Sequence, residues 1–145
     1  MKKLLLFTFL FITVIGFSQK REWGSVKGNT LTVKEIAPVW PGCQGKKGAG
    51  INACFKQKLA RHIGKNFKYP AGAYKANEQG KVVVEFYITE QGTVDIKSIS
   101  GGSKLLQEEA KRNITSIPKM AKPGMMAGKP RAIKYIVPIT FKTGK

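Results

Sequence analysis

Histidine and cysteine are scarce in this chain, which has one histidine, His62, and two cysteines, Cys43 and Cys54. A structural zinc site takes four strong ligands, and two thiolates with one imidazole leave the fourth position empty. Thiol redox catalysis is typical of a C-x-x-C motif, whereas ten residues separate these two cysteines. We therefore expect no metal site, no cofactor and no thiol-based active site.

Paired catalytic groups are also missing from the sequence. Catalysis of most kinds needs a nucleophile, a base and an orienting group within reach of each other. The carboxylates of Glu85, Glu90 and Asp95 lie on or near one predicted hairpin, but nothing marks two of them as a paired acid and base. The sequence predicts a protein that is not an enzyme.

The first 18 residues have the pattern of a secretory signal peptide. Two lysines precede an apolar run, Leu4 to Phe17, which has the length of a signal-peptide core and is short for a membrane span. Gly16 and Ser18 are small residues that fit cleavage before Gln19. We expect export and removal of this segment; the alternative is an uncleaved membrane anchor.

The two cysteines of an exported chain favour one disulfide. The stretch CQGKKGAGINAC contains three glycines and has no apolar run before Ile51, which predicts a loop. A Cys43–Cys54 bridge across this loop would stabilise the fold by roughly 3 kcal/mol, mainly by restricting the unfolded chain.

Acidic residues are few, with 8 Asp and Glu against 26 Lys and Arg, a net charge of +18. Without Lys2 and Lys3 the 24 remaining cations and 8 anions give +16. Such an excess fits an anionic partner. Export argues against nucleic acid, so lipopolysaccharide, an anionic cell-wall polymer or an acidic protein surface remain; a merely solvated surface is the other interpretation.

Hydrophobic periodicity predicts the order helix, strand, strand, helix, strand. The stretch NACFKQKLARHIGKNF (52–67) has one apolar stripe at helical spacing, with Asn52 as candidate N-cap, and a short helix is expected over 71–77. The stretch GKVVVEFYITEQGTVDIKSIS (80–100) alternates with period two around a turn at Glu90–Gly92, which predicts a hairpin.

The second long helix is predicted after Ser103, its candidate N-cap, and Pro118 should end it. Its inner stripe is Leu106, Ala110, Ile114 and Ile117. The stretch 119–130 is predicted to be a loop. Its methionines, Met120, Met125 and Met126, are soft ligands suited to copper(I), but flexible apolar filling is the favoured interpretation.

The last stretch, RAIKYIVPITF (131–141), alternates as a strand but contains Pro138. A helical crossover from the second strand of the hairpin to this one makes those two strands parallel, with the first strand between them. The last strand then lies at an edge, where a proline needs no ladder partner. An open edge also offers backbone groups to an added peptide strand, and neighbouring lysines favour an acidic one.

From residue 69 to 141 the chain resembles the C-terminal domain of TonB, the energy transducer of Gram-negative envelopes. The resemblance is carried by YP (69–70), QGKVVVEFYITEQGTV (79–94), LLQEEAKRNITSIPKM (105–120), GKP (128–130) and YIVPITF (135–141). The upstream segments PVWPGC and CFKQKLARHIGKNFKYP are similar to the extended form of Bacteroidetes-type TonB-like proteins.

The resemblance implies an α+β fold, a three-stranded antiparallel or mixed sheet packed by two helices, with an N-terminal helical and loop extension. It divides the chain into a signal peptide (1–18), an extension and loop (19–50) and a TonB C-terminal-like domain (51–145). It implies a periplasmic location and binding of the TonB box of outer-membrane receptors by strand addition, in energy-dependent transport. The implied contact residues are Tyr69, Pro70, Ile133, Lys134, Tyr135, Ile136, Val137, Pro138, Ile139, Thr140 and Phe141.

Two departures from a full transducer bear on this hypothesis. The apolar segment has no histidine to couple to inner-membrane motor proteins, and only about 20 residues precede PVWPGC, which span at most about 70 Å. They favour a free-standing adaptor, decoy or companion of a separate transducer. The alternatives are a basic envelope protein that binds lipopolysaccharide or wall polymer, and a structural homodimer formed edge to edge.

Overall fold

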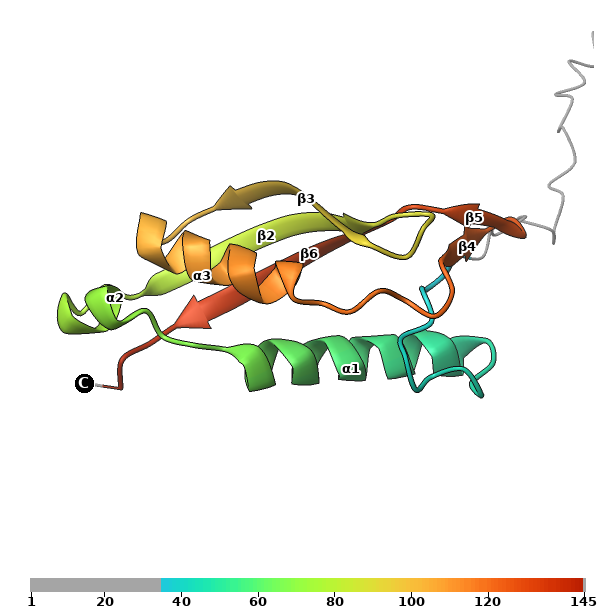
Figure 1. Cartoon of the computed structure of the whole chain (residues 1–145), viewed down its shortest axis with the longest axis horizontal. Coiled ribbons are helices and arrows are strands. Elements are labelled where there is room, and N and C mark those ends of the chain that lie inside the picture. Colours follow the sequence, from blue (N-terminus) through green and yellow to red (C-terminus); the bar gives the residue numbers. More distant parts are fainter. Residues whose placement is uncertain (1–34, 145) are drawn as a thin grey trace, which may run out of the picture. The chain divides into compact units, whose positions relative to one another are not determined.

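The computed structural model describes residues 35–144, which form two three-stranded sheets and three helices (Figure 1). The elements in chain order are β1 (Glu35–Ile36), α1 (Ala49–Asn66), α2 (Ala71–Lys75), β2 (Gly80–Ile88), β3 (Val94–Ser100), α3 (Lys104–Thr115), β4 (Gly124–Met126), β5 (Lys129–Arg131) and β6 (Ile133–Phe141). The expected signal peptide and a weak strand expected around Leu31 lie outside the described residues.

The main sheet has the strand order β3-β2-β6, with β2 antiparallel to both neighbours. The predicted topology is therefore confirmed, since β3 and β6 run parallel on either side of the central strand. The hairpin turn has Gly92 at φ +80°, as its role in the turn requires. The fold class, α+β with an N-terminal helical extension, is also confirmed.

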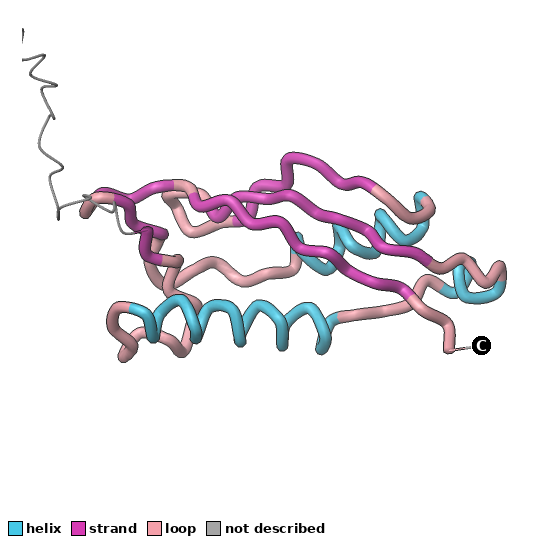
Figure 2. Tube along the Cα trace, turned by 180° about the vertical axis from the view of Figure 1, so that it is seen from behind, coloured by secondary structure: helices cyan, strands magenta, loops and turns pink. Residues whose placement is uncertain are grey.

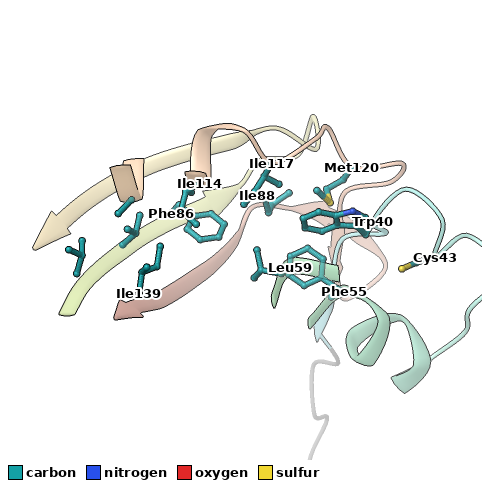
Figure 3. Close-up of a cluster of buried hydrophobic side chains, with 14 of the residues drawn as sticks. Trp40, Cys43, Phe55, Leu59, Phe86, Ile88, Ile114, Ile117, Met120 and Ile139 are labelled. Atoms are coloured by element: carbon teal, nitrogen blue, oxygen red, sulfur yellow. The ribbon is translucent and has the colours of Figure 1, made fainter. Parts of the chain in front are cut away.

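One face of the main sheet is buried by the helices. Val82, Val84, Phe86 and Ile88 of β2 have no exposed area, and the predicted stripe of α3 packs with them. Figure 3 shows how Trp40 and Phe55 of the N-terminal part join this same core beside Ile88. The residues before α1 therefore belong to the packing of the domain.

The start of α1 differs from the sequence prediction. The helix begins at Ala49 after Gly48, whose φ of +51° makes the turn out of the loop. Asn52 lies inside the first turn, where its Oδ1 accepts a hydrogen bond from the Ala37 backbone N–H at 2.9 Å. Asn52 therefore fastens the strand β1 segment to the helix instead of capping it. The caps of α3 follow the prediction: Ser103 Oγ accepts from Leu106 N–H, and the helix ends before Pro118.

The expected loop at 119–130 is wrong in part, because it contains the hairpin β4–β5, which forms the second sheet in the order β1-β4-β5. Its two turn residues, Ala127 and Gly128, both have positive φ, as a tight type I′ turn requires. Three-residue strands are too short to show a period, and alanine gives no warning of positive φ. Met120 is buried beside Trp40 (Figure 3), and Met125 and Met126 lie in β4.

Candidate partner-binding edge

β6 is an edge strand, paired only with β2 among residues 35–144. The hairpin turn fixes which backbone groups point where. Thr89 N–H donates to Thr93 O at 2.8 Å, so odd-numbered residues of β2 bond β3 and even-numbered residues bond β6. Val84 is even-numbered and lies opposite Val137. Val137 therefore bonds β2, and Pro138, one residue further, points to the free side.

The same parity defines the open edge of β6, by which we mean the outward backbone groups of Lys134, Ile136, Pro138 and Thr140. Pro138 has no N–H, so the open edge offers three N–H donors and four C=O acceptors. The side chains of all four residues are exposed, and nothing among the described residues pairs with this side of the strand. The proline therefore sits where the central strand does not need it.

The side chains of β6 alternate between two environments. On the inner face Ile133, Ile139 and Phe141 are buried, while Tyr135 and Val137 are half-buried. On the outer face Ile136 is 58% exposed, and Lys134 Nζ lies 2.8 Å from Glu85 Oε1 of β2. The hydrogen bond and charge of Glu85 raise the pKa of Lys134.

Tyr135 marks the place where α1 meets the inner side of β6. Its ring stacks on Phe55 at 4.7 Å and on Phe86 at 5.7 Å between ring centroids. Burial and the nearby carboxylate of Glu35 raise the pKa of Tyr135 above its ordinary value.

A hollow of about 200 Å³ lies next to Tyr135 and was not predicted from the sequence. Its lining is Glu35, Ala37, Asn52, Phe55, Lys56 and Tyr135. These residues come from β1 and the segment after it, from the first turns of α1 and from β6, so only the tertiary fold brings them together. The sequence pointed to Phe55 as part of the helical stripe, to Asn52 as a cap and to Tyr135 as a contact residue, but not to their meeting in one hollow.

Tyr69 and Pro70, the second predicted contact, lie at the other end of β6. The Tyr69 ring meets Phe141 edge-on at 5.7 Å, and its hydroxyl donates to the Glu78 carbonyl. Pro70 precedes α2 as its N-terminal flanking residue. Both residues therefore adjoin Phe141, the last residue of the predicted contact strand, and the Tyr69 side chain makes contacts within the domain.

An ion pair between the buried Glu109 and the exposed Arg112 holds the segment before Tyr69 against α3. Glu109 accepts from Arg112 Nε at 2.7 Å and from the backbone N–H of Lys68 at 2.9 Å, and Arg112 also donates to the Asn66 carbonyl at the end of α1. Desolvation raises the pKa of Glu109, but the hydrogen bonds from Arg112 and Lys68 outweigh it and leave the pKa below its usual value. This clamp fixes the C-terminal end of α1.

His62 links α1 and the end of α3 through hydrogen bonds in which its Nδ1 accepts and its Nε2 donates. Asn66 Nδ2 donates to the His62 carbonyl at 2.9 Å and approaches His62 Nδ1 at 3.2 Å, so Nδ1 is the acceptor and Nε2 carries the hydrogen. Nε2 then donates toward Ser116 Oγ at 3.1 Å. A histidine that donates to a serine cannot take its proton, so this pair is structural.

The Cys43–Cys54 disulfide is present, with Cα atoms 6.1 Å apart. It links the loop before α1 to the second turn of the helix, and Cys43 is buried in the core. Among residues 35–144 no three of His, Cys, Asp and Glu gather as metal ligands. None of the described helices is both long and apolar enough to cross a membrane.

Comparisons with known proteins match the part of the chain that holds this edge. Residues 65–143 match the family model for the C-terminal region of the Gram-negative bacterial TonB protein. The NMR solution structure of Helicobacter pylori TonB-CTD (residues 194–285) is 25% identical, over 63% of this chain and 96% of that one, with a TM-score of 0.46. A longer form of it (residues 179–285) is 24% identical, over 61% and 79%, with a TM-score of 0.44. No match to a curated protein was found.

Proposed function

Because the chain belongs to the family of Gram-negative TonB C-terminal domains, we propose that it binds the N-terminal TonB box of an outer-membrane receptor by strand addition to β6. The family acts in the energy coupling of transport, as a non-enzymatic interaction domain of the envelope that contacts outer-membrane receptors. For this chain we propose a periplasmic location after signal-peptide removal, with Ile133–Phe141 as the contact strand and Tyr69–Pro70 flanking its end.

The open edge of β6 is the single observation that carries this proposal. An extended peptide pairs with a series of free donors and acceptors at strand spacing. The open edge of β6 has three free N–H donors and four free C=O acceptors. Lys134 and Lys142 lie on or beside this row, and a net charge of +16 without Lys2 and Lys3 would speed the approach of an acidic peptide.

Ile136→Pro tests the proposal, since it removes an outward N–H without touching the ladder to β2. We expect peptides from receptor N-termini to lose about tenfold in affinity by calorimetry, because each hydrogen bond is worth about 1 kcal/mol and the new ring also crowds the edge. Ile136→Thr is the matched control, because it removes the exposed apolar side chain but keeps the N–H. Unchanged binding by a folded Ile136→Pro variant would refute strand addition to β6.

A second function is favoured by the distribution of charge along the chain. Between Glu35 and Glu78 there are eight Lys and Arg and no acidic residue, and none of the eight forms an ion pair among the described residues. We propose as the alternative that the exposed side of α1 binds lipopolysaccharide or an anionic wall polymer. Affinity for lipopolysaccharide that does not fall with salt would exclude this alternative.

A further inference from the structure

The hollow beside Tyr135 lies on the free side of β6. Of the three strands of the main sheet only β6 contributes to its lining, and the other walls come from α1 and the β1 segment. Figures 1 and 2, seen from opposite sides, both place α1 beyond β6 and away from β2. The hollow therefore adjoins the space that a strand added to β6 would occupy.

α1 runs alongside β6 over its C-terminal two-thirds. Phe55 stacks on Tyr135 at 4.7 Å and Phe67 lies 5.0 Å from Phe141. The twelve steps from Phe55 to Phe67 rise about 18 Å along the helix, and the six steps from Tyr135 to Phe141 rise about 20 Å along the strand. The two elements therefore advance by similar distances. Leu59 accordingly lies at the level of Val137, Ile63 at the level of Ile139, and Lys56 at the level of Tyr135.

This alignment sets what an added strand would meet. Its side chains alternate between the two faces of the sheet, and those on the inner face point toward α1. A residue level with Val137 faces the half-buried Val137, with the buried Leu59 beside it and the half-buried Ile63 one helical turn further along. A residue two positions away, level with Tyr135, enters the hollow beside Lys56 and Asn52.

Resting on the proposed function, we propose that α1 is the second wall of the binding groove and reads two inward side chains of the added strand. The first is apolar and covers Val137 and Ile63. The second, two residues away, is a carboxylate held in the hollow by Lys56. The helix that precedes the main sheet thus sets sequence preference, while the open edge of β6 supplies the backbone bonds.

Charge decides between a carboxylate and other side chains in the hollow. Lys56 on one wall is opposed by Glu35 on the other, so the two side chains alone favour neither sign. The acid-free stretch 36–77 adds three further cations on α1, Lys58, Arg61 and Lys65, and two in the loop before it, Lys46 and Lys47. The field at the hollow is therefore positive, which favours an acidic guest.

Selection of phage-displayed dodecapeptides on the purified chain, followed by titration of the enriched peptides, tests this inference. We expect a consensus with an apolar residue and an Asp or Glu two positions apart. Lys56→Glu should replace the acidic position by Lys or Arg and weaken the original peptide about tenfold, with recovery when its acid is changed to Lys. Lys65→Glu is the matched control, because it makes the same charge change on the opposite side of the helix.

The outcomes separate this inference from the proposed function. If Lys56→Glu selects the same consensus as the wild type, or Lys65→Glu changes it equally, α1 does not read the guest although strand addition stands. If no enriched peptide loses affinity on Ile136→Pro, both proposals are overturned. Circular dichroism of each variant confirms that the comparison is made between folded proteins.

Discussion

The two edges of the main sheet are built differently. β3 contains a bulge opposite Glu85 and Phe86, where the Lys97 ammonium group lies 2.7 Å from Asp95. β6 pairs in unbroken register over all nine residues and has α1 alongside. Bulges and charges are common protections of an exposed edge. One edge of this sheet is therefore protected by a bulge and an ion pair while the other is straight, which is why we propose β6 as the edge that pairs with a partner.

Removal of the disulfide that anchors α1, the helix beside β6, should cause the largest loss of stability. The Cys43→Ser, Cys54→Ser double variant loses the link between the loop and α1, and we expect a loss of about 3 kcal/mol in the free energy of unfolding. Urea titration with and without reductant measures it. The wild type under reductant should match the variant; a variant as stable as the oxidised protein would mean that the bridge does not constrain α1.

Substitution at the end of β3 should cost nearly as much. A Cβ at Gly101, where φ is +78°, would lie 2.4 Å from the Lys81 carbonyl oxygen. We expect Gly101→Ala to destabilise by about 2–3 kcal/mol. Gly128→Ala is the matched control, since φ is +76° but no atom lies within 4 Å, and about 1 kcal/mol is expected there. Equal losses for both would show that conformation, not crowding, governs Gly101.

The clamp that fixes α1 near Tyr69 should give a smaller, pH-dependent effect. Glu109→Gln removes the charge that Arg112 binds, and we expect a loss of about 1–2 kcal/mol at pH 7. Because the pKa of Glu109 is lowered by folding, its contribution is complete above the ordinary carboxyl pKa and disappears as pH falls through the folded-state value. The stability difference from wild type, measured from pH 7 to 2, should shrink toward acid; a constant difference would contradict this.

Deletion of Lys97 should have the smallest effect on stability. It is also the most direct test of the difference between the β3 edge and the β6 edge. Without the extra residue β3 pairs regularly with β2 and becomes a second straight edge. We expect weak self-association that increases with concentration in sedimentation velocity. Lys97→Ala, which keeps the extra residue, should self-associate no more than the wild type. If both variants associate, the charge of Lys97 and not the bulge protects this edge.

Much of the main sheet follows from local sequence. The period-two run Val82–Ile88, the Gly92 turn and the helix that begins after Ser103 each have strong local signals, and the right-handed crossover then places the last strand at an edge. Pro138 gave the same answer independently. These features depend on neighbours in sequence, which is why the topology could be predicted.

The parts that were not predicted depend on contacts between distant segments. Asn52 has the composition of a cap, but its partner, the Ala37 N–H, is fifteen residues away. The hollow beside Tyr135 needs β1, α1 and β6 together. The outward direction of the Ile136 backbone N–H follows from the hydrogen bond at the Thr89–Thr93 turn, which alternation alone does not reveal. The N–H groups of Tyr135 and Val137 point to β2, so a proline at either position would break the ladder to β2 and leave the open edge unchanged.

Pro138 also makes one position of the open edge different from the others, because it lacks an N–H. The backbone N–H groups of Lys134 and Ile136 are followed by a position without a donor, Pro138, and then by the N–H of Thr140. The pattern of donors along the open edge is therefore not the same at each step of two residues. A ligand that slides along it by one step meets a different arrangement of donors and acceptors. Under the proposed strand addition, Pro138 would therefore also help to fix the register of the bound peptide.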